Sequence, residues 1–335
     1  MPSWGEILVE LNNTKNQFGG PDIDAVRRKY LVGLHAYTKR PTIIYTSRWV
    51  TPITGADPSS LSVSIADIQG LMEVMKGIAG TELDLVIHSP GGSIDAAEAF
   101  VTYIRSKFTH VRAIVPYAAM SAATMICMSC DEVVMGKHSF LGPIDPQFVM
   151  QTQLGPRMVP AQAIVEQFEK AQEEIKNDQT KLASWVPMLG QYGPDLLIQC
   201  ENATQLSRQL VEQWLGKYMF SGDNAKANEV ASWLAKHGEH KTHSRYLDRA
   251  KLEAKGIKIV KLEDDQAFQD AVLSLYHAVT LTFQNSVVAK LIENHMGKVF
   301  MLMTAFQPMP QPKAVALTFP FVVPGMPPDA PPPPA

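Results

Sequence analysis

Residues 83–95 decide the fold of this chain, and they read LDLVIHSPGGSID. The mainly apolar run Leu83–His88 is short and is followed, after Ser89, by a Pro-Gly-Gly turn, which is typical of a buried strand that ends in a loop. Ser93 is suited to cap a helix after the turn. Gly91 and Gly92 let the backbone expose its N–H groups beside that helix start, an arrangement that stabilises an anion or an oxyanion.

Short apolar runs and helical patterns alternate on both sides of this stretch. The residue patterns predict strands near 41–46, 83–88, 111–115 and 132–135, and helices near 65–78, 94–108 and 122–130. Strand and helix alternate three times, which predicts βαβ units with parallel strands buried between helices. The predicted fold class is therefore α/β.

A second strand-to-helix junction lies at Ser121, inside the sequence YAAMSAAT of residues 117–124. A serine at such a junction can point its hydroxyl out of the turn, as in a nucleophile elbow, and the next amide, that of Ala122, can join an oxyanion hole. Alone, Ser121 also fits a helix N-cap, and the glycine pair alone fits a simple tight turn. Both elements follow parallel strands, whose carboxyl ends share one sheet edge, so the pair together favours a ligand site.

These motifs resemble those of Clp-type peptidases and signal peptide peptidase A, and most of all those of the serine dehydrogenase proteinase family. The resemblance rests on SPGG at residues 89–92, on Ser121, which follows Gly92 by 29 residues, and on LGPIDPQ at residues 141–147. It is strongest over residues 41–150.

The resemblance implies a ClpP/crotonase-like spiral of ββα units with a helical insertion and a C-terminal helix. It implies a serine endopeptidase with Ser121 as nucleophile and with oxyanion donors at Gly91 or Gly92 and at Ala122. It also implies a peptide or protein substrate and a homo-oligomer, because relatives with this fold assemble into rings.

The general base departs from the Clp-type pattern, because Asp145 stands where those peptidases carry a histidine. His243 falls where they carry an aspartate. We therefore expect that the two residues have exchanged places, giving a Ser121–His243–Asp145 triad whose geometry matters more than its order in the chain. A lysine base, as in signal peptide peptidase A, stays open. The candidates are Lys170, Lys176, Lys181 and Lys241.

Two other functions stay open. A non-catalytic scaffold would keep the fold without the usual base and would act through its helical segment and its Pro-rich tail. An acyl-CoA hydratase or isomerase would share the fold and the backbone oxyanion hole but would work through carboxylates, and no glutamate pair stands near the two motifs.

We expect neither a metal nor a cofactor. His237, His240 and His243 are spaced by three residues, but no carboxylate or cysteine beside them in the sequence completes a convincing ligand set. Cys127 and Cys130 have the spacing of a redox motif, yet they lie in an apolar stretch of small residues and are expected to be buried free thiols.

The patterns divide the chain into four segments. They are an N-terminal helical arm over 1–40, a catalytic core over 41–262 with a helical insertion at about 161–236, a C-terminal helix over 263–300, and a Pro-rich tail over 301–335 that is expected to lack regular structure.

The composition of the chain limits the classes of partner and the cellular locations that we expect. The chain has 335 residues, a formal net charge of -3 and three cysteines. This charge predicts no nucleic-acid partner, and so few cysteines favour a reducing compartment over a secreted disulfide framework. No apolar run reaches the roughly 18 residues that suggest a membrane span. We therefore expect a cytoplasmic protein without a membrane anchor of its own.

Overall fold

The computed structural model describes residues 3–52, 57–152 and 155–304. Its body is built on a seven-stranded sheet in the order β10-β5-β3-β2-β1-β11-β12. The strands β5, β3, β2 and β1 are parallel to one another, as predicted, and β10 adds a fifth parallel strand beside β5. The strands β11 and β12 add an antiparallel hairpin. The strands are β1 (Thr42–Ser47), β2 (Glu82–His88), β3 (His110–Val115), β5 (Glu132–Met135), β10 (Ile259–Lys261), β11 (Val288–Asn294) and β12 (Val299–Met303).

Helices cover both faces of this sheet, so its central strands are buried on both sides. In β1, Ile43 and Tyr45 pack into one hydrophobic cluster and Ile44 into another on the opposite face. Such strands appear in the sequence as nearly continuous apolar runs because neither face meets water. The helices of the first face are α3 (Asp67–Met75), α4 (Ile94–Arg105) and α5 (Ala122–Met128), and those of the second are α2 (Ile23–Thr38) and α12 (Gln266–Gln284), with α1 (Trp4–Asn13) packed against α2 and α12.

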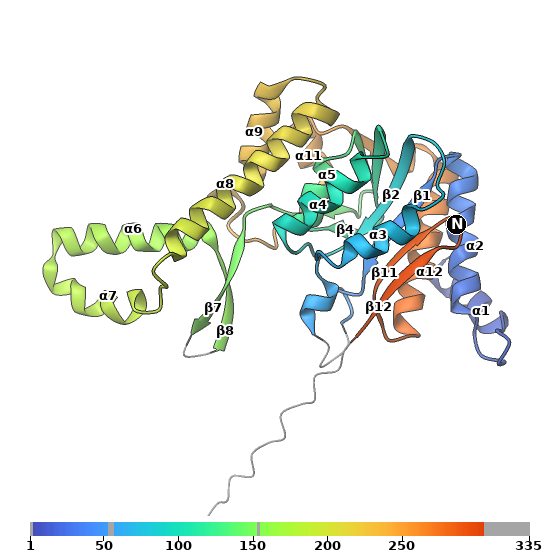
Figure 1. Ribbon diagram of the computed structural model, residues 1–335, viewed down its shortest axis with the longest axis horizontal. Helices are drawn as coiled ribbons and strands as arrows, with labels where there is room; N and C mark the ends of the chain where they lie inside the picture. Colours follow the sequence, from blue (N-terminus) through green and yellow to red (C-terminus); the bar gives the residue numbers. More distant parts are fainter. Residues whose placement is uncertain (1–2, 53–56, 153–154, 305–335) are drawn as a thin grey trace, which may run out of the picture.

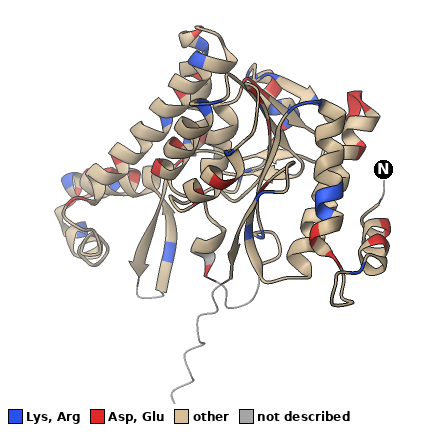
Figure 2. Cartoon of the chain, turned by 45° about the vertical axis from the view of Figure 1, so that its right-hand side comes forward, with Lys and Arg blue, Asp and Glu red and all other residues tan. Residues whose placement is uncertain are grey.

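A long segment projects from the body and consists mainly of helices, as predicted (Figure 1). It begins with a hairpin, β7 (Gln147–Thr152) and β8 (Gly155–Pro160), and continues with α6 (Ala161–Asn177), α7 (Leu182–Leu189), α8 (Leu196–Trp214) and α9 (Asn224–Ala235). The residue pattern did not predict the hairpin, because its apolar residues do not form a fully buried face: Val149 and Met158 are mostly exposed, and Phe148, Met150 and Val159 are only partly buried against the projecting helices. Figure 2 shows acidic and basic residues interspersed along the projecting helices.

Several short elements complete the described part of the chain. A small three-stranded sheet joins β4 (Ala118–Ala119), β6 (Phe140–Leu141) and β9 (Leu247–Asp248). Two short helices are α10 (His237–His240) and α11 (Arg249–Ala254). Single turns of 3-10 helix lie at Pro58–Leu61, Gln179–Lys181 and Leu262–Asp264, and a π turn lies at Leu215–Met219.

The predicted C-terminal helix over 263–300 is wrong in its second half. Helix α12 ends at Gln284, and β11 and β12 follow. Lys290 and Glu293 resemble the charged face of an amphipathic helix in the sequence, but both are buried in β11 and paired, Lys290 with Asp67 and Glu293 with Arg27. Residues 301–303 of the predicted tail belong to β12, and residues 305–335 lie outside the described part of the chain.

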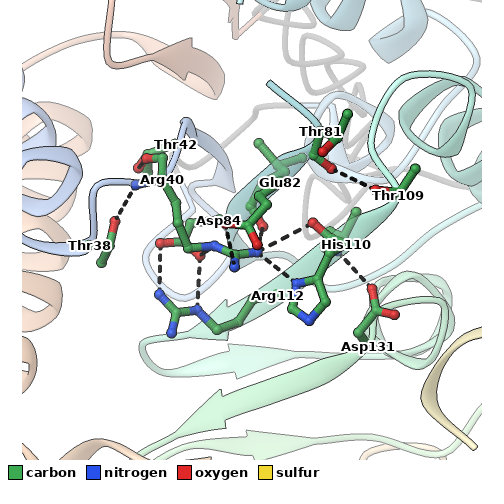
Figure 3. Close-up of polar contacts among 12 residues, drawn as sticks. Thr38, Arg40, Thr42, Thr81, Glu82, Asp84, Thr109, His110, Arg112 and Asp131 are labelled. Carbon is green, nitrogen blue, oxygen red and sulfur yellow. Dashed lines mark hydrogen bonds and ion pairs between the residues drawn. The ribbon is translucent and has the colours of Figure 1, made fainter. Parts of the chain in front are cut away.

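A buried charge network holds the amino ends of the central strands in register (Figure 3). The Asp84 carboxylate on β2 accepts two hydrogen bonds of 2.9 Å from the guanidinium of Arg112, its partner on β3. Arg40, just before β1, also pairs with Asp84 at 2.9 Å and lies 2.9 Å from His110 Nδ1. A fork of two hydrogen bonds has a defined geometry, so it specifies the register better than a single point charge would. This network lies at the sheet edge opposite to the glycine turn.

Candidate active site

The glycine turn at the end of β2 packs directly against the Ser121 junction. Gly91 has a φ of 92°, a backbone conformation that favours glycine. A Cβ atom at this position would lie 2.4 Å from the Met120 carbonyl oxygen and 2.7 Å from the Ser121 Cβ. Any side chain here would push the two elements apart, so glycine is required for their close approach.

A segment before α3 clamps the turn from its other side. The Val63 amide donates to the Gly91 carbonyl at 2.7 Å, and the Ser93 amide donates to the Val63 carbonyl at 3.0 Å. A Cβ on Gly92 would lie 2.3 Å from the Val63 carbonyl oxygen. The Gly91 amide donates to Ser89 Oγ at 3.2 Å. Within the described chain the amides of Gly92 and Ala122 donate no hydrogen bond, which leaves both available to an oxyanion.

Ser121 has the backbone of a strained elbow. Its φ is 50° and its ψ is -121°, although it is not glycine. It occupies the N-cap position of α5, but its side chain makes no capping hydrogen bond in the described structure. A serine that only capped a helix would adopt an extended conformation and accept a bond from the first turn. Non-glycine residues at positive φ concentrate at functional sites, because the fold must hold them there at a cost.

Asp145 and His243 form a pair although 98 residues separate them along the chain. His243 Nδ1 lies 2.9 Å from Asp145 Oδ1, and the Asp145 side chain is only 2% exposed. An ionised carboxylate can only accept hydrogen bonds, so Nδ1 carries the proton. In the neutral imidazole this leaves Nε2 as a free base.

One pocket of about 720 Å³ contains both Ser121 and His243. Its wall combines the glycine turn with parts of the projecting segment that sequence reasoning did not identify. These parts are Phe148 and Met158 of the hairpin and Asn202, Ala203 and Leu206 of α8. The structure therefore brings the predicted residues Ser121, His243, Gly91 and Gly92 to one pocket.

A second histidine contacts the same carboxylate. His237 Nδ1 lies 2.8 Å from Asp145 Oδ2, so each carboxylate oxygen faces one imidazole. His240 points elsewhere, with Nε2 at 2.8 Å from the Trp233 carbonyl oxygen. Among the described residues there is no group of three or more His, Cys, Asp or Glu that could hold a metal ion.

The lysines considered as alternative bases do not reach the pocket. Lys170 and Lys176 lie on α6 and Lys181 follows it, and all three are exposed. Lys241 is exposed beyond α10. No lysine lines the pocket that contains Ser121 within the described part of the chain.

Three other groups near the elbow, one imidazole and two thiols, are buried and uncharged. His88 ends β2, its Nδ1 lies 3.0 Å from the Ala118 carbonyl oxygen, and burial lowers the pKa of its imidazole to about 4. Cys127 and Cys130 are free thiols on and just after α5, as predicted, and burial raises the pKa of Cys130 to about 12. None of these three side chains lines the pocket that contains Ser121.

None of the helices in the described ranges has the length and apolar character needed to cross a bilayer.

Comparison with known proteins assigns the chain to a family. Residues 63–277, or 215 of 335, match the family described as ClpP-like SDH-type serine proteinase. Uncharacterized protein MJ0137 of Methanocaldococcus jannaschii is 28% identical over 180 residues, covering 49% of this chain and 58% of that protein. Uncharacterized protein MJ1495 of the same organism is 27% identical over 196 residues, covering 57% and 58%. The chain thus spans less than two thirds of the length of either relative.

A solved structure, a serine-to-alanine mutant of the 1510-N membrane-bound stomatin-specific protease, aligns with 59% of this chain and 74% of that chain, at 14% identity and a TM-score of 0.35. The family match covers the glycine turn, the Ser121 elbow, Asp145 and His243. The α/β class and the resemblance noted in the sequence are confirmed. The chain belongs to the ClpP-like SDH-type serine proteinase family and has its ClpP-like fold.

Proposed function

We propose that this chain is a serine endopeptidase in which Ser121 is the nucleophile, His243 the general base and Asp145 the residue that orients the base. The observation that carries the proposal is the pairing of Asp145 with His243 at the pocket that also contains the strained Ser121. It supplies a base to a family member that lacks the histidine of the Clp-type pattern.

The chemistry follows from the proton positions. His243 Nε2 removes the hydroxyl proton of Ser121 while Oγ forms a bond to the peptide carbonyl carbon. The resulting imidazolium is stabilised by Asp145, which already accepts a hydrogen bond from Nδ1. When the C–N bond breaks, Nε2 returns the proton to the leaving amine, and water then hydrolyses the acyl-enzyme by the same steps.

The negative oxygen of the tetrahedral intermediate needs donors that are already in place. The amides of Gly92 and Ala122, which donate no hydrogen bond within the described ranges, lie beside Ser121, and the start of α5 adds its positive dipole end. Gly91 serves this hole through its close approach to Ser121, because its own amide is bonded to Ser89. Losing one such donor costs about 3 to 4 kcal/mol in the barrier.

The other functions considered are less well supported. The scaffold interpretation depended on a missing base, and His243, which lines the same pocket as Ser121, is a candidate for that role. A hydratase would need carboxylates in the pocket, and Asp95 is the one acidic residue that lines it within the described ranges. A homo-oligomer and a cytoplasmic location stay predictions.

Peptide-bond hydrolysis tests the proposal. Purified full-length protein is incubated with casein, and new peptide termini are identified by mass spectrometry. We expect cleavage by the wild type and its loss, by roughly a million-fold in kcat, in Ser121→Ala. Ser129→Ala, at the other end of α5 and outside the pocket, is the matched control and should keep activity. Equal cleavage by Ser121→Ala would assign the activity to another site.

A further inference from the structure

The Asp145 carboxylate lies between two imidazoles, and the proposed mechanism uses only one of them. His237 Nδ1 faces Oδ2 at 2.8 Å and His243 Nδ1 faces Oδ1 at 2.9 Å. The Asp145 side chain is 2% exposed, whereas His237 and His243 are 15% and 18% exposed. Each carboxylate oxygen therefore has a different histidine as its hydrogen-bond partner, and water has little access to either oxygen.

A backbone hydrogen bond joins the segment that carries Asp145 to the helix that precedes His237. The Ile144 amide, next to Asp145, donates to the Leu234 carbonyl oxygen in α9 at 3.0 Å. His237 starts the following short helix α10, whose turn is closed by the Lys241 amide bonded to the His237 carbonyl at 2.8 Å. His243 lies beyond that turn, in the loop before β9.

This placement separates the roles of the two histidines. His243 lines the pocket with Ser121, but His237 does not line it. His237 thus reaches the reacting atoms only through Asp145. A carboxylate held by one donor can rotate about its Cβ–Cγ bond, whereas a donor on each oxygen fixes that rotation.

We propose that His237 is a positioning residue for the catalytic base. It donates its Nδ1–H to Asp145 Oδ2, which fixes the carboxylate and directs Oδ1 at the Nδ1–H of His243. The inference deepens the proposed function and rests on it. In the sequence, His237 stood out only as one of three evenly spaced histidines considered as metal ligands. The proposed role is to position Asp145 and needs no metal.

The test measures the second-order rate of labelling of Ser121 by a fluorophosphonate probe, which needs no known substrate. In His237→Ala this rate should fall about 10- to 100-fold, since a small misplacement of a reacting group has effects of this size. His237→Asn should restore most of the rate, because its amide nitrogen occupies the place of Nδ1. His237→Gln, whose amide reaches the place of Nε2 instead, should not restore it.

His240→Ala is the matched control, because His240 lies in the same helical turn but bonds to Trp233 and not to Asp145. Its labelling rate should stay close to that of the wild type. For a peptide that the enzyme cleaves, His237→Ala should lower kcat and leave KM unchanged, since His237 does not line the pocket.

The inference is overturned if His237→Ala labels at the wild-type rate, if Asn and Gln restore labelling equally, or if His240→Ala is as slow as His237→Ala. Where His237→Ala does not fold, as judged by its thermal unfolding, the comparison of the Asn and Gln variants decides alone. His243→Ala separates this inference from the proposed function. If His243→Ala labels at the wild-type rate, the proposed base is wrong; if only the His237 variants are unaffected, the positioning role alone fails.

Discussion

Lys290 Nζ lies 2.7 Å from Asp67 Oδ1 and 2.9 Å from Asp67 Oδ2, with both side chains 1% exposed. Asp67 also accepts hydrogen bonds from the Ser64 amide at 2.9 Å and from the Tyr45 hydroxyl at 2.7 Å. The pair thus ties β11 to the segment around Val63, which clamps the glycine turn. The hairpin at the end of the described chain supports the wall of the pocket.

Removing one partner of this buried pair should destabilise the folded protein. Lys290→Met leaves the Asp67 carboxylate buried without its cation, and the free energy of unfolding should fall by about 3 to 5 kcal/mol in urea titrations at pH 7. The double variant Lys290→Met with Asp67→Asn should recover part of the loss, because no unpaired charge remains.

The matched control is Lys298→Met, which removes a partly exposed lysine 3.9 Å from Glu73. It should cost at most about 1 kcal/mol, as exposed pairs do. Equal losses in the two lysine variants would show that the buried pair adds nothing special to stability.

The close approach of the glycine turn to Ser121 predicts a selective effect of an added methyl group. Gly91→Ala places a Cβ about 2.4 Å from the Met120 carbonyl, so the turn must move away from the elbow. We expect strong loss of fluorophosphonate labelling at Ser121 together with a lower unfolding temperature.

Gly80→Ala separates this clash from backbone strain. Gly80 has a φ of 89°, close to that of Gly91, but a Cβ there would meet no atom of the described residues within 4 Å. This variant should lose roughly 1 to 2 kcal/mol for the left-handed backbone alone and keep its labelling. Labelling that is equally reduced in both variants would contradict the assigned role of the Gly91 approach.

His88 predicts a dependence of stability on pH. Its folded-state pKa of about 4 lies below the ordinary value of 6.5, because burial disfavours the charged imidazole. The folded state therefore binds fewer protons than the unfolded state between these two values. Stability is fully present above pH 6.5 and is lost as the pH falls towards 4, by an amount of about 3 kcal/mol at about 1.4 kcal/mol per pKa unit.

Urea titrations of the wild type and of His88→Asn from pH 7 to pH 4 measure this contribution. Asparagine can still donate to the Ala118 carbonyl oxygen that faces His88 Nδ1, but it does not titrate. The free energy of unfolding of His88→Asn should decline less over this range. Parallel declines in the two proteins would mean that His88 is not the group responsible.

The local parts of the site could be predicted from the sequence. Gly91, Gly92 and Ser121 belong to short motifs whose residue types indicate the backbone conformation of each turn. Because the strands before these turns are parallel, the motifs are expected to share one edge of the sheet. The pairing of His243 with Asp145 was predicted from a resemblance to Clp-type peptidases and from the exchange of two residue types. The structure places these two side chains in contact.

The remaining parts depend on contacts between distant segments. His237 and Asp145 are 92 residues apart, and local spacing shows only that a histidine is present. Phe148 and Met158 enter the pocket wall from a hairpin whose apolar residues are at most partly buried, so the residue pattern did not indicate two strands there. Lys290 and Glu293 suggested a solvated helix because their partners, Asp67 and Arg27, lie far away in the chain.

The central claim is that Ser121 is activated by His243. The most direct measurement is the rate of fluorophosphonate labelling of folded full-length protein, with the adduct mapped by mass spectrometry, in the wild type, Ser121→Ala and His243→Ala. We predict an adduct on Ser121 in the wild type, none on the Ser121→Ala protein, and labelling slower by at least about a thousand-fold in His243→Ala. An unlabelled wild type that is well folded, or equal labelling of wild type and His243→Ala, would contradict this account.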